Sequence, residues 1–478
     1  MATPTLRPTK AVVRYGGFFL SVGAARVLGL LITSVTFPIL VRRLGVETYG
    51  LWSYVVAVCA FLDVIANPGL SAYAGQQVAA RRSAAIDWIP DFLVLRSLAS
   101  LTAMGVLFVL AAFESRPEAR ELLHWYGVGA MLVPLTGSDF LLTSLELFHA
   151  RSLLSLIQQL LYAAGIVFLV RSPKDVLWLP ASILGSALIA NVAGWIVLWH
   201  NGFRPAITLK PHKWRGILAP SLHYAATTMM ASVYHRTGHV VVRWVLGDYA
   251  LGLYAAAVRF VDILRNLVSI VLNILMPRMA LSAQSASGLR RLVQAAVSVL
   301  AIISLPLMLG TLATAHLVVP WILGKNYVAA VALVRWMSPF LLTAPIASLM
   351  SGTVLYALGK HRAYLLSASV GAIVAVLGSL ILVRTSGLAG VCVAFVLAEL
   401  AVGVTAYFLV PEQLRDLWNN RLIAIAGIAA LLMLAAVRLA NSFSSRPVIV
   451  IAVGAVVYLV GLAVMGKKPL MEQFGGAR

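Results

Sequence analysis

Apolar stretches long enough to cross a lipid bilayer follow one another along most of the chain, and short polar connections separate them. A transmembrane helix needs about 20 mostly apolar residues, and stretches of this kind between Val13 and Met465 predict fourteen spans. We expect helices throughout, because an open strand edge in lipid would leave backbone groups without hydrogen bonds. The predicted fold class is an all-α polytopic membrane protein. The predicted spans are residues 13–40, 50–65, 88–113, 123–148, 153–170, 176–199, 216–245, 251–276, 292–315, 328–358, 364–383, 388–410, 422–439 and 448–465.

The spans divide into two groups of six and a final pair. The most basic connection lies in the middle of the chain and separates the first six spans from the next six. Four parts are therefore expected: an N-terminal lobe at residues 1–200, a basic cytoplasmic linker at residues 201–215, a C-terminal lobe at residues 216–410, and two C-terminal helices with a tail at residues 411–478.

A short motif occurs at the same place in both groups of six. The sequence LGxxxYGLW begins at Leu44, and LGxxxLGLY begins at Leu246. Each copy falls at the turn between the first and second span of its group, where glycine permits a tight turn. Two repeated bundles are the usual framework for alternating access, with a central site between them. The motif therefore predicts two lobes related by a pseudo-two-fold axis along the membrane normal.

Composition supports the membrane assignment and limits the function classes. Of the 478 residues, 61% are hydrophobic and 11% are charged, whereas a soluble domain carries about 25% charged residues. The net charge of +21 is dispersed in small clusters without a nucleic-acid recognition motif, so no nucleic-acid partner is expected. Basic residues are roughly twice as frequent in the connections on one side, which places both termini in the cytoplasm.

Charged residues inside the spans are the main candidates for function, because a charge at membrane depth is costly and usually faces a polar pathway. Arg26, for example, lies about 20 Å along the first span. Arginines outnumber acids in these positions, so we expect a cationic cavity. The arginines are Arg26, Arg96, Arg236, Arg243, Arg259, Arg265 and Arg335, and the acids are chiefly Asp63, Asp139, Glu146, Asp262 and Glu399.

Each candidate also has a purely structural interpretation. The arginines near span ends, Arg96, Arg243 and Arg335, could equally extend to the interface. Asp262 stands between Arg259 and Arg265 and could form a structural ion pair with one of them. Asp63 could serve as an ion-pair partner or as a carboxylate that couples transport to protons.

Polar uncharged residues leave further alternatives open. His235 and His239 are one helical turn apart, which suits a metal pair or a proton site. No third ligand is evident, so a polar cavity lining is the favoured interpretation and no metal is expected. Gln158 and Gln159 could bind sugar or bridge helices.

The chain contains no GxxxxGK[ST] phosphate loop and no catalytic cluster, so neither an enzyme nor a bound cofactor is expected. Coupling of transport to H+ or Na+ is one option.

Three segments resemble a known family. RRLGVETYGLW at residues 42–52, LGDYALGLYAAA at 246–257 and LGKNYVAAVALVRW at 323–336 resemble bacterial polysaccharide flippases of the multidrug, oligosaccharidyl-lipid and polysaccharide exporter superfamily. The resemblance implies a V-shaped pair of six-helix lobes with two accessory C-terminal helices. It also implies transfer of an undecaprenyl-pyrophosphate-linked oligosaccharide between leaflets of the bacterial inner membrane, for O-antigen, capsule or exopolysaccharide synthesis. Many relatives carry an acid where this chain has Gly238, which puts ion coupling through that position in doubt.

A pyrophosphate is the hardest part of such a substrate to move, because an unpaired anion in hydrocarbon has a large desolvation cost. Arginine suits this task, since its planar guanidinium stays protonated and binds phosphate oxygens in pairs. The predicted substrate site is cationic and consists of Arg26, Arg236, Arg259, Arg265, Arg96 and Arg335, with Asp63, Asp262 and His239 as coupling or ion-pair residues.

Other functions fit parts of the same pattern. A peptidoglycan lipid-precursor flippase also moves a pyrophosphate, whereas a multidrug or cation antiporter would favour an acidic cavity. The alternative outside transport is a scaffold of a polysaccharide synthesis complex. A polysaccharide polymerase and a chain-length regulator are the partners that the flippase hypothesis implies.

Overall fold

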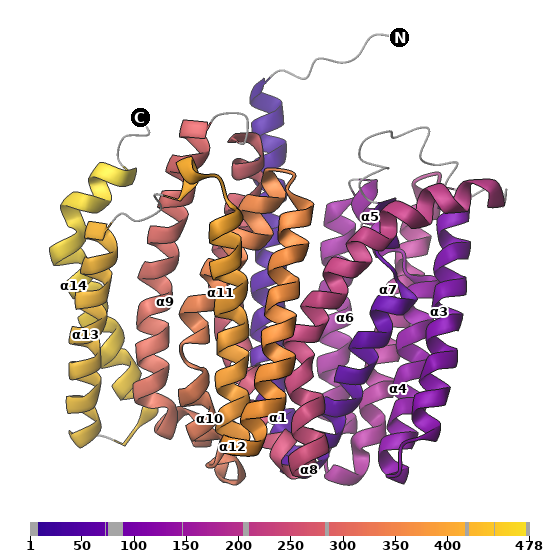
Figure 1. Cartoon of the computed structure of the whole chain (residues 1–478), viewed down its shortest axis with the longest axis horizontal. Helices are drawn as coiled ribbons and strands as arrows, with labels where there is room; N and C mark the ends of the chain where they lie inside the picture. Colours follow the sequence, from indigo (N-terminus) through magenta and orange to yellow (C-terminus); the bar gives the residue numbers. More distant parts are fainter. Residues whose placement is uncertain are drawn as a thin grey trace. The chain divides into compact units, whose positions relative to one another are not determined.

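The computed structural model describes residues 8–71, 73–74, 89–145, 147–203, 210–282, 286–415, 420–443 and 445–474. Within these ranges the secondary structure is helical and contains no strand, so the predicted all-α fold is confirmed (Figure 1). The helices are α1 (Pro8–Ala66), α3 (Ile89–Ala112), α4 (Pro117–Thr136), α5 (Asp139–Ser144), α6 (Phe148–Leu169), α7 (Trp178–His200), α8 (Trp214–Ser282), α9 (Ala286–Leu323), α10 (Ala330–Met337), α11 (Phe340–Ser348), α12 (His361–Leu409), α13 (Asn420–Phe443) and α14 (Pro447–Phe474). Short 3-10 turns lie at Pro173–Leu177, Pro211–Lys213, Lys325–Tyr327 and Glu412–Leu414, and a π-helix at Leu349–Leu355 continues α11.

The described helices have the length and apolarity of membrane spans. Eight of them qualify by length and composition, or nine if α10 and the bent segment after it form one span. Three helices contain a glycine with non-helical backbone angles, namely Gly45 in α1, Gly247 in α8 and Gly387 in α12. Each of these glycines lies between two predicted spans. The helices therefore leave room for fourteen spans, and that number stays a prediction.

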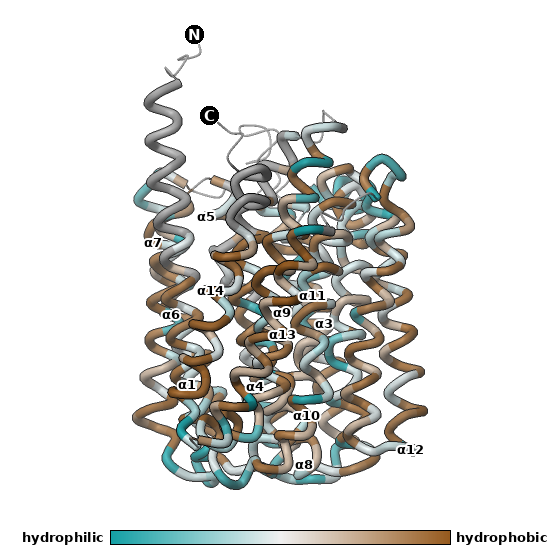
Figure 2. Tube along the Cα trace, turned by 90° about the vertical axis from the view of Figure 1, so that its left-hand side faces the viewer, coloured by the Kyte–Doolittle hydropathy of each residue, from teal (hydrophilic) through white to brown (hydrophobic). Residues whose placement is uncertain are grey.

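Apolar side chains cover the outside of the helices. In Figure 2 hydrophobic residues run along the helices, and hydrophilic residues gather towards the helix ends. Large apolar side chains such as Phe113, Phe443 and Val464 are 85%, 84% and 76% exposed. A soluble protein rarely exposes so much contiguous apolar surface, so the chain is a multi-pass membrane protein whose outer surface contacts lipid.

The chain forms two compact units. Unit 1 contains Met1–Leu44 and Val55–Met229, and unit 2 contains Gly45–Tyr54 and Met230–Arg478. Both α1 and α8 therefore contribute to each unit. The segment Gly45–Tyr54, which includes the first copy of the LG motif except Leu44, belongs to unit 2 although the chain on either side of it belongs to unit 1.

Unit 1 is built around an apolar cluster that joins α3, α5, α7 and the start of α8, with Ile89, Leu141, Leu198 and Ile217 at its centre. Asp91 is fully buried and ties the linker to this cluster, because its Oδ1 accepts hydrogen bonds from the Lys210 backbone N–H at 2.8 Å and from the Trp214 indole N–H at 2.9 Å.

An arginine caps one helix of unit 1. Arg43 Nη1 donates to the carbonyl oxygens of Ile166, Val167 and Val170 at 3.1, 2.6 and 2.7 Å. These carbonyls lie at the end of α6, where the helix itself supplies no donors and a cation is favoured by the helix dipole. Arg43 therefore fixes the C-terminus of α6 to α1.

Two apolar clusters lie in unit 2 among the residues that the structure describes. One joins α8, α9, the π-helix and α12, with Val268, Leu300, Val354 and Ala406 among its fully buried members. The other packs α13 and α14 together and against α9. There the Tyr458 hydroxyl donates a hydrogen bond of 2.6 Å to the Ile302 carbonyl oxygen. The two C-terminal helices are thus attached to unit 2 through α9.

Candidate transport site

Three turns of unit 2 share one unusual backbone conformation. Gly45 has φ 73° and ψ 177°, Gly247 has φ 84° and ψ −179°, and Gly324 has φ 97° and ψ 166°. Side-chain-bearing residues essentially never adopt this region. Each glycine follows a leucine, so these three LG dipeptides form the same kind of turn. The first two copies are the repeat predicted from the sequence, and the third lies in the segment LGKNYVAAVALVRW that carries the family resemblance.

The first two LG turns pack backbone to backbone. A Cβ atom on Gly50 would overlap the carbonyl oxygen of Asp248, and one on Gly252 would overlap the carbonyl oxygen of Val46. The second glycine of each motif therefore touches the turn of the other copy. This reciprocal contact explains why both copies keep glycine at that position.

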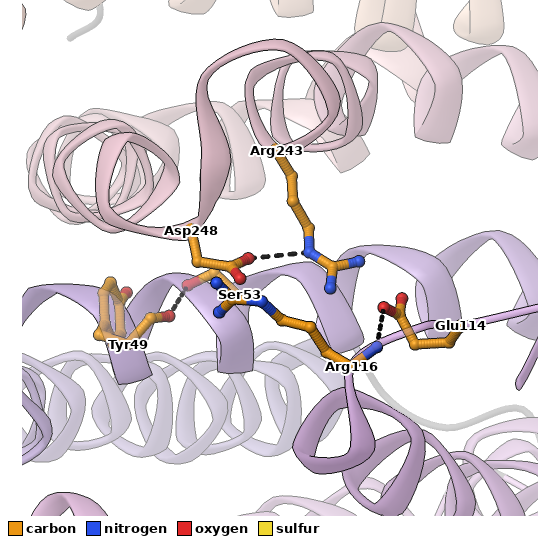
Figure 3. Close-up of polar contacts among 6 residues, drawn as sticks. All are labelled: Tyr49, Ser53, Glu114, Arg116, Arg243 and Asp248. Carbon is orange, nitrogen blue, oxygen red and sulfur yellow. Dashed lines mark hydrogen bonds and ion pairs between the residues drawn. The ribbon is translucent and has the colours of Figure 1, made fainter.

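An ion pair stabilises the same region. Arg243 Nε donates to Asp248 Oδ1 at 2.8 Å, and the two side chains are only 10% and 3% exposed. The Arg243 guanidinium also lies 3.7 Å from the centre of the Tyr54 ring. Figure 3 shows Arg243 extending to Asp248, and Ser53 donating to the Tyr49 carbonyl oxygen at 2.7 Å. Of the predicted span arginines, Arg243 thus has a structural partner on each side.

The third turn lies in the same neighbourhood. Tyr327 follows Gly324 and is 1% exposed, and its hydroxyl lies within electrostatic range of Tyr49 and Tyr249. Burial is the main reason that the pKa of Tyr327 is raised. The buried Tyr327 hydroxyl therefore lies near two other tyrosines, Tyr49 after the first LG turn and Tyr249 after the second.

The charged groups on α8 divide into paired and unpaired residues. Arg265 Nε lies 3.3 Å from Asp262 Oδ1, and its Nη2 donates to Asn266 Oδ1 at 3.3 Å. Neither Arg236 nor Arg259 forms an ion pair or side-chain hydrogen bond within the part of the chain that the structure describes. Both lie within electrostatic range of Tyr49. Asp262 therefore takes the ion-pair alternative with Arg265 and leaves Arg259 uncompensated.

The two histidines of α8 are packed against aromatic rings. The His235 ring lies 4.1 Å from that of Tyr234, and the buried His239 ring meets Tyr254 edge-on at 5.3 Å. Among the described residues, no three His, Cys, Asp or Glu side chains are grouped to hold a metal ion.

The space next to Gly238 is occupied by the Tyr254 hydroxyl, which a Cβ at position 238 would overlap. A tyrosine therefore fills the room that a larger side chain at position 238 would need. The Tyr254 hydroxyl is itself fully buried and has no hydrogen-bond partner within the described residues.

Tyr254→Phe is expected to leave the thermal stability unchanged or to raise it, because a buried hydroxyl without a partner costs about 1–3 kcal/mol. Gly238→Ala should destabilise the wild type and should do so less in the Tyr254→Phe background, although ring carbon Cζ at 2.9 Å from the added Cβ keeps the rescue partial. Melting of the four purified proteins in detergent measures this cycle. Equal penalties for Gly238→Ala in both backgrounds would show that the hydroxyl does not set the limit.

A buried carboxylate lies near the paired charges of unit 2. Glu399 is 3% exposed, and its Oε2 has no hydrogen-bond partner within the described part of the chain. Arg265, Asp262 and Tyr234 lie within electrostatic range of it. In the sequence Glu399 is only one of several acids in the predicted spans, since its burial depends on how α8 and α12 pack.

Unit 1 contains a polar cavity of about 380 Å3. Asp63 and Arg96 both line it and attract each other electrostatically. Arg96 is 7% exposed, and its guanidinium lies 5.4 Å from the centre of the Phe140 ring. The other polar lining residues are Asn67, Ser71, Ser138, Arg151, Ser155, Gln158 and Asn191. Most of these lining residues were not predicted from the sequence. The signal that could have indicated them is a polar side chain inside an apolar span.

The other two predicted site residues are Arg335 and Arg26. Arg335 is exposed at the end of α10, where its Nη2 is 3.4 Å from His316 Nδ1. Arg26 is on α1, but its side chain is outside the described residues. The structure thus groups Arg236 and Arg259 around Tyr49 in unit 2, and Asp63 and Arg96 around a cavity in unit 1. The common central cavity stays a prediction.

Comparison with known proteins identifies the family. The profile of the family described as Polysaccharide biosynthesis protein matches residues 18–283. An Escherichia coli (strain K12) protein named "Putative O-antigen transporter" is 24% identical over 323 residues, which cover 65% of this chain and 75% of that protein.

Solved structures show the same fold. The lipid II flippase MurJ in an inward closed conformation superimposes with a TM-score of 0.75 at 14% identity, covering 95% of this chain and 99% of MurJ. An inward-facing multidrug resistance MATE family transporter of the MOP superfamily gives a TM-score of 0.64 at 15% identity, covering 81% and 97% of the two chains. These similar proteins are transporters and flippases rather than enzymes. The chain belongs to the family of polysaccharide biosynthesis proteins and has the fold of the MOP-superfamily transporters.

Proposed function

We propose that this protein is a flippase that moves an undecaprenyl-pyrophosphate-linked oligosaccharide from the inner to the outer leaflet of the bacterial inner membrane. The glycan would serve O-antigen, capsule or exopolysaccharide synthesis. Membership of the polysaccharide biosynthesis family and similarity to the Escherichia coli protein named "Putative O-antigen transporter" support this substrate class.

The observation that carries most weight is the pair Arg236 and Arg259. Both are on α8, and neither has an acidic partner among the described residues. A guanidinium without a counter-ion inside a span is expensive unless an anion arrives to pair with it. A pyrophosphate provides such an anion, and its oxygens match the paired N–H groups of arginine.

The proposed mechanism treats the three chemical parts of the substrate separately. The polyprenyl tail stays in lipid, the pyrophosphate pairs with arginines, and the glycan stays hydrated while the two repeated halves alternate between leaflets. Protonation of a carboxylate such as Asp63 or Glu399, or binding of Na+, would couple this motion to a gradient. We place both termini in the cytoplasm, with a polymerase and a chain-length regulator as partners on the same glycan.

The charge of the substrate distinguishes two other possible transport functions. The MurJ fold favours a peptidoglycan lipid precursor as the second candidate, because that substrate also carries a pyrophosphate on a polyprenyl chain. A cationic drug is disfavoured, since Arg236 and Arg259 would repel it. Thus the anionic lipid carrier is the common element of the leading functions, and the glycan distinguishes them.

Translocation in vesicles tests the proposal. The purified protein is reconstituted in liposomes with undecaprenyl pyrophosphate that carries a fluorescent oligosaccharide, and a membrane-impermeant quencher reports its transfer between leaflets. We expect faster transfer than in protein-free vesicles, and slower transfer of lipid II in the same assay. A rate equal to that of protein-free vesicles would leave only the scaffold role, and preference for lipid II would favour the peptidoglycan precursor.

A further inference from the structure

We infer that the polar cavity of unit 1 is a binding site for one sugar ring of the glycan. This inference rests on the proposed function, and it assigns the glycan to a site other than the arginines of unit 2. The cavity lies entirely within unit 1, among the second half of α1, α3, the α4–α5 connection, α6 and α7.

The geometry is that of a built pocket. Its volume of about 380 Å3 is at the lower end of the range of 300–1,000 Å3 typical of small-ligand sites. This room suits a single ring rather than a whole oligosaccharide. Gly137 keeps part of the wall open, since a Cβ there would approach the Arg96 Nη2 atom to 3.1 Å. Arg96 is held on the other side by the Phe140 ring.

Several polar groups in the wall are ordered by contacts of their own. The Ser138 backbone N–H donates to Asn191 Oδ1 at 3.3 Å, and the Ser138 hydroxyl donates to the Asn191 carbonyl oxygen at 3.4 Å. Asn67 Oδ1 accepts from the Ser71 hydroxyl and backbone N–H, both at 3.2 Å. These bonds hold the amide groups of Asn67 and Asn191 in place, so the N–H2 ends of both amides remain as donors.

The mixture of donors and acceptors selects the class of ligand. A sugar hydroxyl both donates and accepts, so a ring needs a wall that offers both functions. Here Asp63 only accepts, Arg96 and Arg151 only donate, and the amides and serine hydroxyls do both. A pyrophosphate carries acceptors alone, so it could pair with Arg96 and Arg151 but would offer no donor to Asp63. A cationic drug or a metal cation would meet two guanidinium groups against one carboxylate.

Two adjacent glutamines provide a matched test. Gln158 lines the cavity, whereas Gln159 does not and instead donates to Ser155. The full-length protein in detergent is mixed with methyl α-D-glucopyranoside and methyl α-D-galactopyranoside, and saturation-transfer NMR reports which protons of the sugar contact the protein. We expect a signal with at least one hexoside in the wild type and in Gln159→Leu. The signal should fall about tenfold in Gln158→Leu and in Asp63→Asn.

A folding control accompanies each sample. All variants should keep the wild-type melting temperature and should bind sugar-free undecaprenyl pyrophosphate as the wild type does, because that lipid does not use the cavity. No hexoside signal in the wild type, or equal loss in Gln158→Leu and Gln159→Leu, would overturn the inference. These results are independent of the translocation assay: a flippase without hexoside binding refutes only the sugar site, whereas hexoside binding without lipid transfer refutes only the proposed function.

Discussion

Gly252→Ala is expected to destabilise the protein severely, and Gly50→Ala combined with it should leave little folded protein in the membrane. Each added Cβ would overlap a backbone carbonyl oxygen, of Val46 or of Asp248, in the opposite LG turn. A backbone carbonyl cannot rotate away as a side chain does, so the turns themselves must separate. Overpacking of this kind costs about 1–3 kcal/mol or more per site, against a total stability of about 5–15 kcal/mol.

The measurement is the yield of monodisperse protein in detergent, together with its melting temperature. Gly427→Ala in α13 is the matched control, because a Cβ there meets no atom within 4 Å and its backbone is helical. Alanine in an open helical position should be neutral or stabilising by about 0.5–1 kcal/mol. Normal yield and melting of the double variant would show that the two turns are not in firm contact.

The LG motif illustrates what could be predicted from the sequence. Its recurrence at Leu44 and Leu246 predicted a repeat with glycine turns, and the structure gives both glycines nearly the same backbone angles. The reciprocal contact of Gly50 and Gly252 could not be predicted, because it joins segments about 200 residues apart in the chain. The third turn at Gly324 has the same conformation without the second glycine of the motif.

The polar sites show a similar limit. Hydropathy alone predicts the spans and identifies the arginines within them, since a charge in an apolar stretch is visible in the sequence. Whether an arginine is paired depends on neighbours in three dimensions. Arg243 is held by Asp248 and Tyr54, whereas Arg236 and Arg259 have no acidic partner among the described residues. The cavity around Asp63 and Arg96 needs five segments of unit 1 to come together, so no local pattern indicates it.

Glycan export is expected to fall at least about tenfold in Arg259→Ala or Arg236→Ala, and about a hundredfold in the double variant. A hydrogen bond to a charged group contributes about 1.5–3 kcal/mol, and about 1.4 kcal/mol corresponds to a factor of ten. Protein levels should stay normal, because neither side chain holds another described residue by a hydrogen bond or ion pair. Lysine at position 259 should give an intermediate rate, since it keeps the charge and loses the paired N–H groups.

Transfer of the fluorescent lipid-linked oligosaccharide in vesicles, with surface polysaccharide of complemented cells as a second readout, measures this effect. Arg438→Ala in α13 is the matched control, because it removes an exposed arginine from the pair of C-terminal helices. If the slower transfer results from weaker pairing with the pyrophosphate, each variant should weaken binding of sugar-free undecaprenyl pyrophosphate by the same factor by which it slows transfer. Slower transfer with unchanged lipid binding would assign Arg236 and Arg259 to the conformational change, and unchanged transfer would remove both from the substrate site.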